Sequence, residues 1–130
     1  MKKIIVFTST RAEYGLLRNL IFKLTKNKNF NVKILVTGTH LSRKYGLTIN
    51  EIYEDGFKNI IDKVAIPMSK KIQGSELTGI CIQKFSLYLK SNIFDLAIIL
   101  GDRFEAFAMA SACFLNNLEI AHIHGGEKTQ

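Results

Sequence analysis

The sequence has few of the features that mark secreted, membrane-bound or metal-binding proteins. Its only cysteines, Cys81 and Cys113, lie far apart and lack the C-x-x-C spacing of a redox or zinc site. Every apolar run is shorter than the roughly 20 residues that cross a bilayer, so we expect no membrane partner. The apolar run after Lys2 and Lys3 ends at Phe7, which is too early for a signal peptide. These absences predict a cytoplasmic protein with two reduced thiols in its core.

The size and charge of the chain limit its organisation and its partners. Its 130 residues include one proline and are 47% hydrophobic, which predicts one sizeable core and a single domain, residues 1–130. The 18 Lys and Arg outnumber the 11 Asp and Glu, and the net charge of +7 favours a polyanionic partner such as nucleic acid or a phosphorylated small molecule. The basic residues are dispersed, without the interleaved aromatics of a single-strand binder, so we expect no nucleic-acid partner.

Five short segments rich in β-branched and apolar residues predict strands. They are residues 3–8, 32–36, 60–66, 95–100 and 119–123. Several carry apolar residues at consecutive positions, as strands covered by helices on both faces do. The segments between them have helical periodicity, and strand followed by helix, repeated, predicts right-handed crossovers. The expected fold is therefore α/β, a three-layer, Rossmann-like, doubly wound parallel sheet.

Capping patterns mark the expected helix ends. Thr10 with Glu13 forms a capping box that opens a helix after the first strand. Its predicted apolar face comprises Leu16, Leu17, Leu20, Ile21 and Leu24. Thr48 with Glu51 repeats the pattern in a short helix that Gly56 ends.

Two longer helices are expected in the second half of the chain. One spans residues 73–91, and the other spans residues 103–116 and is opened by a capping box of Asp102 and Glu105. The last helix is apolar nearly all round, so we expect it to be buried on more than one side.

In a doubly wound sheet, ligands bind at the carboxyl ends of the strands. The loop after the first strand contains neither a G-x-G-x-x-G motif nor a P-loop. It offers instead the hydroxyl of Thr10 and the guanidinium of Arg11 at a helix N-terminus, where free backbone N–H groups and a cation favour a phosphate. The alternative is that Thr10 and Glu13 only cap the helix and that Arg11 is solvated.

Three further candidates follow the second and fourth strands. Gly38 permits a tight turn, and His40 lies just beyond the strand end, where an imidazole can meet a ligand, although a lone loop histidine is usually not catalytic. Asp102 directly follows the fourth strand and is a candidate general base or acid. Its alternative role is the capping box with Glu105.

The end of the fifth strand carries an H-I-H-G-G-E sequence. His122 and His124 are two residues apart and so point the same way in a strand. This pair suggests a metal, but no third nitrogen or sulfur ligand has a fitting spacing, so we expect no metal site. Glu127 is the better candidate for acid/base chemistry, and its alternative is a solvated loop carboxylate.

Five motifs, in this order, resemble the hydrolysing UDP-N-acetylglucosamine 2-epimerases of bacterial sialic acid synthesis. The motifs are T-R-A-E-Y-G-L-L from residue 10, V-T-G-T-H-L-S from 36, D-G-F from 55, L-G-D-R-F-E from 100 and H-I-H-G-G-E-K-T from 122. The resemblance covers the whole chain. It implies the N-terminal half of a glycosyltransferase B type fold, in which two Rossmann-like domains face a cleft, with the C-terminal domain missing from this chain.

The resemblance also implies a reaction and roles for individual residues. UDP-N-acetylglucosamine and water would give N-acetylmannosamine and UDP by elimination to a 2-acetamidoglucal and hydration, without a cofactor, in a full-length homo-oligomer. Arg11 matches the arginine near the nucleotide diphosphate, and Asp102 matches the family's aspartate after the glycine of G-D-x. Where many relatives have H-I-E with a catalytic glutamate, this chain has His124, so either His124 or Glu127 takes the remaining proton transfer.

Three rival functions stay open on the sequence. A UDP-N,N'-diacetylbacillosamine 2-epimerase of legionaminic acid synthesis would share the same motifs. A non-hydrolysing epimerase is disfavoured by R-A-E-Y in place of R-P-E and by G-D-R in place of G-D-T. If the polypeptide stops at Gln130, the chain is expected to be a non-catalytic UDP-sugar binding or interaction module, because half a cleft cannot exclude water.

Overall fold

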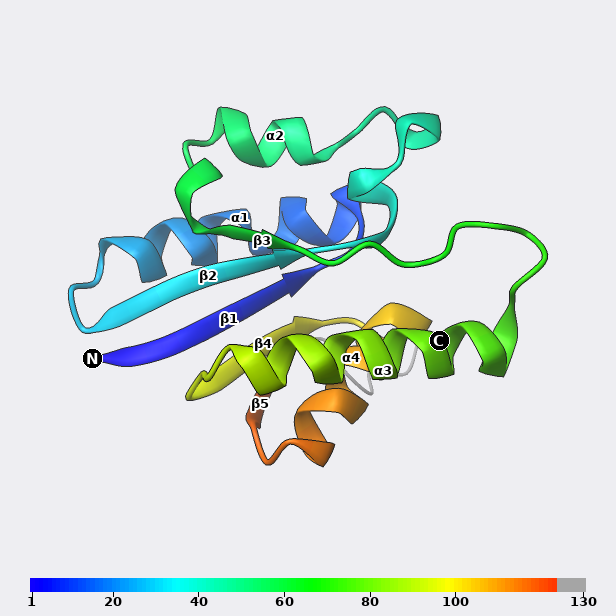
Figure 1. The fold of residues 1–130 in the computed structure, drawn as a ribbon. Coiled ribbons are helices and arrows are strands. Elements are labelled where there is room, and N and C mark those ends of the chain that lie inside the picture. Colours follow the sequence, from blue (N-terminus) through cyan, green and yellow to red (C-terminus); the bar gives the residue numbers. More distant parts are fainter. Residues whose placement is uncertain (124–130) are drawn as a thin grey trace, which may run out of the picture.

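A five-stranded parallel sheet forms the middle layer of the computed structural model, which describes residues 1–123 (Figure 1). The strands are β1 (Lys2–Thr8), β2 (Phe30–Val36), β3 (Ile61–Lys63), β4 (Leu96–Leu100) and β5 (Glu119–Ile123). Their order in the sheet is β3-β2-β1-β4-β5, and all neighbouring pairs are parallel. The sheet grows outward from β1 in both directions, so the predicted doubly wound α/β fold is confirmed.

Helices cover both faces of the sheet, two on each side (Figure 1). They are α1 (Arg11–Lys26), α2 (Ile49–Glu54), α3 (Gly74–Ser91) and α4 (Phe104–Leu115), with short 3₁₀ turns η1 (Gly38–Leu41), η2 (Arg43–Tyr45) and η3 (Lys58–Ile60). No helix among residues 1–123 is long and apolar enough to cross a membrane.

The central strand β1 contributes to two separate hydrophobic cores. Ile4 and Val6 pack with α1 and α2, whereas Ile5 and Phe7 pack with α3 and α4. All four side chains are almost fully buried, because successive residues of a strand point to opposite faces and both faces are covered. This double burial explains the consecutive apolar residues in the sequence.

The N-terminus of α1 forms the predicted capping box. The Thr10 hydroxyl accepts a 3.2 Å hydrogen bond from the Glu13 backbone N–H, and the Glu13 carboxylate accepts one of 3.1 Å from the Thr10 N–H. Leu17 and Ile21 are buried as expected, but Leu16 is 71% exposed, so its assignment to the buried face is wrong. Adjacent residues of a helix are separated by about 100°, and the buried stripe here centres on Leu17.

The other two predicted capping boxes are wrong. The side chain of Thr48 does not cap α2, because its hydroxyl bonds to the ring of His40 instead. Arg103, not Asp102, is the N-cap residue of α4, and the Glu105 carboxylate binds the Arg103 side chain rather than a backbone N–H. In both helices another side chain, His40 for Thr48 and Arg103 for Glu105, binds the group that the capping pattern assigned to a backbone N–H.

Helix α4 is buried on one side only in the described structure. Met109 and Cys113 are fully buried, whereas Phe107 and Phe114 are 60% and 77% exposed. The expectation of burial on more than one side is therefore wrong for residues 1–123, since α4 lies at the β5 edge of the sheet and packs mainly against α3. Cys81 and Cys113 are free and buried, as predicted.

Candidate functional site

The loops after the strands meet at one edge of the sheet, as the parallel fold requires. Thr8 and Val36 are paired at the ends of β1 and β2, and the Thr37 N–H donates a 3.2 Å hydrogen bond to the Thr8 carbonyl. On the other side of β1, the Gly101 N–H donates to the Ile123 carbonyl at 2.9 Å. The candidate residues before position 124 are thus carried by neighbouring loops at this carboxyl edge.

The turn after β2 packs directly on the loop after β1. Gly38 has φ +65°, and a Cβ at this position would lie 2.8 Å from the carbonyl oxygen of Ser9. Thr39 follows with both its N–H and its hydroxyl donating to that same oxygen at 3.1 Å. The tight turn expected at Gly38 is confirmed, and its physical reason is this close approach. A contact of Gly38 with substrate stays a prediction.

The imidazole of His40 lies inside the fold, under this turn. It is fully buried, with Nε2 2.9 Å from the Thr8 hydroxyl and Nδ1 2.9 Å from the Thr48 hydroxyl. Burial lowers the pKa of His40 to about 4, against the opposing effect of a hydrogen bond to the Thr10 backbone. The ring is therefore neutral at pH 7 and joins the end of β1 to the start of α2. The ring supports the fold internally, and the contact of His40 with a ligand that the sequence suggested stays a prediction.

A buried carboxylate organises the loop after β1. Oε1 of Glu13 accepts hydrogen bonds from the Ser9 N–H at 2.8 Å, the Ser9 hydroxyl at 2.8 Å and the Thr10 N–H at 3.1 Å. Ser9 itself is fully buried. These three donors stabilise the charged carboxylate and fix the direction in which the chain enters α1.

Arg11 stands at the surface in the first turn of α1. Its Nε lies 2.9 Å from Oε2 of Glu51, with 72% of the arginine side chain exposed. Exposed ion pairs contribute little to stability, so Glu51 offers weak competition to a phosphate group. The location at a helix N-terminus agrees with the phosphate role predicted for Thr10 and Arg11, which stays a prediction.

The D-G-F motif has a structural explanation. Asp55 accepts hydrogen bonds from Nε and Nη2 of Arg18 at 2.7 and 2.8 Å, and a third from the hydroxyl of Tyr14. The Arg18 guanidinium holds the pKa of the Asp55 carboxyl below its ordinary value. Gly56, with φ +90°, then ends α2 as predicted. The motif ties α2 to α1, and its Asp55 lines a cavity together with Arg11.

The loop after β4 presents a carboxylate and a guanidinium next to each other. Asp102 is exposed and forms no ion pair within residues 1–123. Arg103 binds Glu105 through Nε and Nη2, both at 3.2 Å, and Glu105 is only 2% exposed. This hydrogen-bonded pairing raises the pKa of Arg103 above its ordinary value. Arg103 was not among the candidates from the sequence, although it stands next to Asp102 in the G-D-R triplet.

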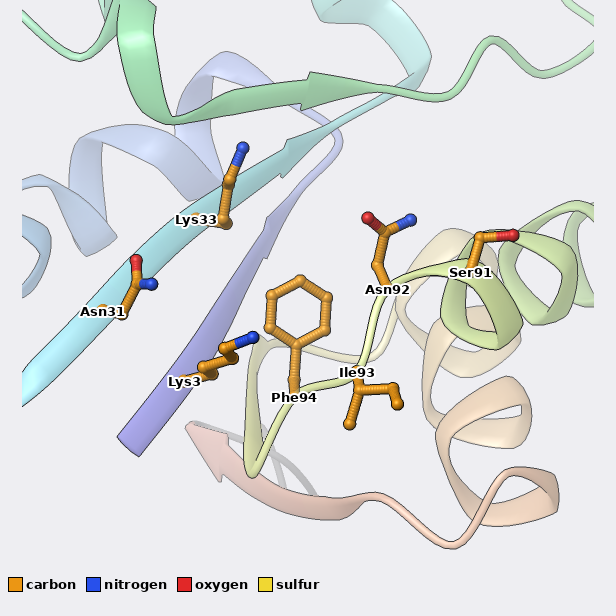
Figure 2. Close-up of a pocket in the computed structure, with 7 residues that line it drawn as sticks. All are labelled: Lys3, Asn31, Lys33, Ser91, Asn92, Ile93 and Phe94. Carbon is orange, nitrogen blue, oxygen red and sulfur yellow. The ribbon is translucent and has the colours of Figure 1, made fainter. Parts of the chain in front are cut away.

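A cavity of about 230 Å³ opens beside Arg103. It lies between η2, the segment 67–73 and the start of α4, and it includes Thr39 from the turn after β2. A second cavity of about 200 Å³ is lined by Lys3, Asn31, Lys33 and Phe94 (Figure 2). Lys3 and Asn31 lie near the starts of β1 and β2, and Phe94 lies just before β4, so this cavity is at the opposite edge of the sheet from the candidate residues.

The end of β5 brings one histidine to the site. His122 is exposed, and its Nε2 hydrogen-bonds to the Gly101 carbonyl. The catalytic candidates His124 and Glu127 lie outside the described residues. Within residues 1–123, no three His, Cys, Asp or Glu side chains gather as metal ligands.

The chain matches known proteins over most of its length. Residues 22–130 match the family model described as UDP-N-acetylglucosamine 2-epimerase. The chain is 39% identical over 131 residues to a polysialic acid biosynthesis protein of Escherichia coli, covering 99% of this chain and 33% of that protein. It is 37% identical over 136 residues to the UDP-N,N'-diacetylbacillosamine 2-epimerase (hydrolyzing) of Legionella pneumophila, covering 99% of this chain and 34% of that protein.

Solved structures share the same fold. The UDP-GlcNAc 2-epimerase from Neisseria meningitidis, bound to UDP-GlcNAc, superposes with a TM-score of 0.79 at 25% identity, over 99% of this chain and 33% of that one. Another crystal structure of a UDP-N-acetylglucosamine 2-epimerase gives a TM-score of 0.80 at 22% identity, over 99% and 33% of the two chains. The chain spans about a third of the length of the relatives that it matches.

Proposed function

The chain belongs to the UDP-N-acetylglucosamine 2-epimerase family, and we propose that it carries one wall of the active site of a hydrolysing epimerase. The proposed reaction converts UDP-N-acetylglucosamine and water to N-acetylmannosamine and UDP. The observation that carries the proposal is the arrangement of the carboxyl edge, where Arg11, Asp102 and His122 stand on the loops or ends of three strands that are neighbours in the sheet.

Arg11 and Asp102 each fit a step of the reaction. Elimination breaks the C1–O bond to UDP and the C2–H bond and forms a C1–C2 double bond; hydration then adds hydroxide at C1 and a proton at C2. Arg11 would offset charge on the leaving diphosphate, as a cation at a helix N-terminus does. Asp102 is exposed and has no ion pair among the described residues. It would act at C2 as the base that removes the proton or as the acid that returns one. His124 or Glu127 would supply the second proton transfer.

We propose that residues 1–130 form one domain that acts together with a second domain. The relatives are about three times as long as this chain, which supports residues 1–130 as an N-terminal Rossmann-like domain of a two-domain protein. A facing domain would close the carboxyl edge and exclude water from the reacting sugar. The assays below therefore use the complete polypeptide that carries these residues.

A second candidate substrate is UDP-N,N'-diacetylbacillosamine. Two relatives, from Legionella pneumophila at 37% identity and Campylobacter jejuni at 38%, are named as hydrolysing 2-epimerases of this sugar. Their identities are close to the 39% of the Escherichia coli polysialic acid protein, so identity does not separate the two sugars.

The test is incubation with UDP-N-acetylglucosamine in deuterated water, followed by proton NMR. We expect free UDP and N-acetylmannosamine carrying deuterium at C2, with the Asp102→Asn variant as the matched inactive control. Deuterium exchange at C2 without release of UDP would replace the proposal with a non-hydrolysing epimerase. Consumption of only UDP-N,N'-diacetylbacillosamine would change the proposed substrate but not the proposed reaction. If neither nucleotide sugar reacts, the proposed epimerase activity is refuted.

A further inference from the structure

The cavity at the amino edge of the sheet, where the strands begin, is lined by charged side chains of one sign only. Its lining comes from β1, from β2 and from the end of α3 with the turn that follows it, and comprises Lys3, Asn31, Lys33, Ser91, Asn92, Ile93 and Phe94 (Figure 2). Among residues 1–123 the lining thus holds two ammonium groups and no carboxylate. A concave surface that carries cations alone attracts anions.

The register of the strands puts the two lysines on the same face of the sheet. Lys3 pairs with Asn31, and Lys33 lies two residues further along β2. Residues two apart in a strand point to the same face. Further along this face, Ile5 and Leu35 are fully buried in the core beneath α3 and α4. The cavity therefore begins where the apolar core of this face ends.

The carboxylates that contact these lysines are outside the lining and are shared with other groups. Asp95 accepts a 2.8 Å hydrogen bond from the backbone N–H of Lys3, whose ammonium forms no ion pair among residues 1–123. Asp62 lies 3.5 Å from the Lys33 ammonium and also accepts a 2.6 Å hydrogen bond from the Tyr88 hydroxyl. An anion between the two lysines would meet one free and one partly compensated charge.

The rest of the lining suits the organic part of a small ligand. The ring of Phe94 stacks on that of Tyr88, with centroids 6.1 Å apart and planes at 25°, so it forms a fixed apolar wall. The Asn92 side chain is held by a 2.9 Å hydrogen bond to the Tyr88 carbonyl, and the Asn31 amide is exposed. The volume of about 200 Å³ is below the roughly 300–1,000 Å³ of pockets that enclose a drug-sized ligand.

We propose that this cavity is a second ligand site, which binds a small organic anion. Its phosphate or carboxylate group would lie between Lys3 and Lys33, and its organic part would pack on Phe94. The site is at the edge of the sheet opposite Arg11 and Asp102, so its ligand is distinct from the reacting UDP-sugar. The inference goes beyond the proposed function and does not rest on it.

The test measures binding to the complete polypeptide, saturated with UDP, by isothermal titration calorimetry. The probes are glucose 6-phosphate, glucuronate and glucose, which differ only at C6. We expect at least one of the two anions to bind at a single site per chain and glucose not to bind. Binding of only one anion identifies the charged group as phosphate or carboxylate. The inference is overturned if neither anion binds, if glucose binds equally well, or if UDP abolishes the binding.

A pair of variants separates the cavity from the general charge of the chain. Lys3→Met should weaken anion binding about tenfold or more, because a charge-assisted contact is lost while the backbone bond to Asp95 remains. Lys2→Met is the matched control, since it removes the same exposed charge from the neighbouring position of β1, which points to the other face. Equal weakening in the two variants would assign the attraction to net charge and overturn the inference.

A third variant tests the cavity without a change of charge. Asn31→Leu should weaken anion binding about threefold, since it removes one neutral hydrogen-bonding group from the lining. Unchanged affinity in both Asn31→Leu and Lys3→Met would place the anion elsewhere on the protein. Turnover of the UDP-sugar should be the same in Lys3→Met as in the wild-type protein. If the wild-type protein turns over neither UDP-sugar, the proposed function fails, whereas this inference is decided by anion binding alone.

Discussion

The ring of His40 and the hydroxyl of Thr8 are hydrogen-bonded at 2.9 Å in the interior, although Thr8 ends β1 and His40 lies in η1, after β2. The Thr8 hydroxyl also donates to the Thr10 carbonyl at 3.3 Å, so it accepts from Nε2–H of His40 and leaves Nδ1 to accept from Thr48. A neutral imidazole satisfies every partner in this arrangement. A second proton would place a charge in the core and remove the acceptor that Thr48 needs.

The first prediction is a dependence of stability on pH that originates at His40. Its pKa is about 4 in the folded protein and about 6.5 in the unfolded chain, so the unfolded state binds the proton more readily between these values. Stability should therefore fall as the pH is lowered from about 6.5 to about 4. Urea unfolding across this range measures the slope, and His40→Gln should have a smaller slope. Equal slopes in the two proteins would contradict the assignment.

The second prediction concerns the buried carboxylate of Glu13. Glu13→Ala removes the acceptor of three hydrogen bonds from Ser9 and Thr10, and we expect a loss of about 1–3 kcal/mol in the free energy of unfolding. Glu76→Ala is the matched control, since Glu76 is an exposed glutamate in the first turn of α3. A loss in Glu13→Ala no larger than in Glu76→Ala would show that the capping box contributes nothing beyond a surface charge.

The third prediction tests Arg11 as a phosphate ligand. Arg11→Ala should weaken UDP binding about tenfold, because a charge-assisted hydrogen bond to the diphosphate is lost. Thermal stability should change little, since the ion pair with Glu51 is exposed. Lys26→Ala removes the same charge at the other end of α1 and should bind UDP as the wild-type protein does. Unchanged binding in Arg11→Ala would leave Arg11 as a solvated residue.

The fourth prediction tests Asp102 as the acid or base. Asp102→Asn should lower kcat by about 10²–10⁴-fold with little change in KM, because the variant keeps the shape of the side chain and loses its proton transfer. The melting temperature should not change, since Asp102 is exposed and unpaired among residues 1–123. Glu119→Gln, an exposed change at the start of β5, serves as the control. A kcat within a few fold of wild type would exclude the catalytic role.

The fold was predictable because it rests on short-range patterns. Consecutive apolar residues gave the strands, including the boundaries of β5 (Glu119–Ile123) without error. The capping box at Thr10 located α1, since both of its hydrogen bonds join residues three apart in the chain. Such patterns are local, so the sequence alone contains the information that they need.

The site was only partly predictable, because its details depend on distant residues. Nothing near His40 in sequence indicates that Thr8 will accept from its ring, or that the histidine expected just beyond the strand end is fully buried. The Arg103–Glu105 pair likewise overrode the local capping pattern that starts at Asp102. A partner 32 positions away decided the first outcome, and a competing local ion pair decided the second; neither follows from helix propensity or capping patterns.

The position of β1 between β2 and β4 has a consequence for synthesis on the ribosome. One edge of β1 is paired once residues 30–36 leave the exit tunnel, but its other edge waits for residues 96–98 of β4. Until then the nascent chain exposes the hydrogen-bonding groups of its most buried strand, which are a template for pairing with other chains. The same pairing places the loop of Asp102 next to the strand that leads to Arg11, so the event that covers the second edge of β1 also brings these two proposed site residues to the same edge of the sheet.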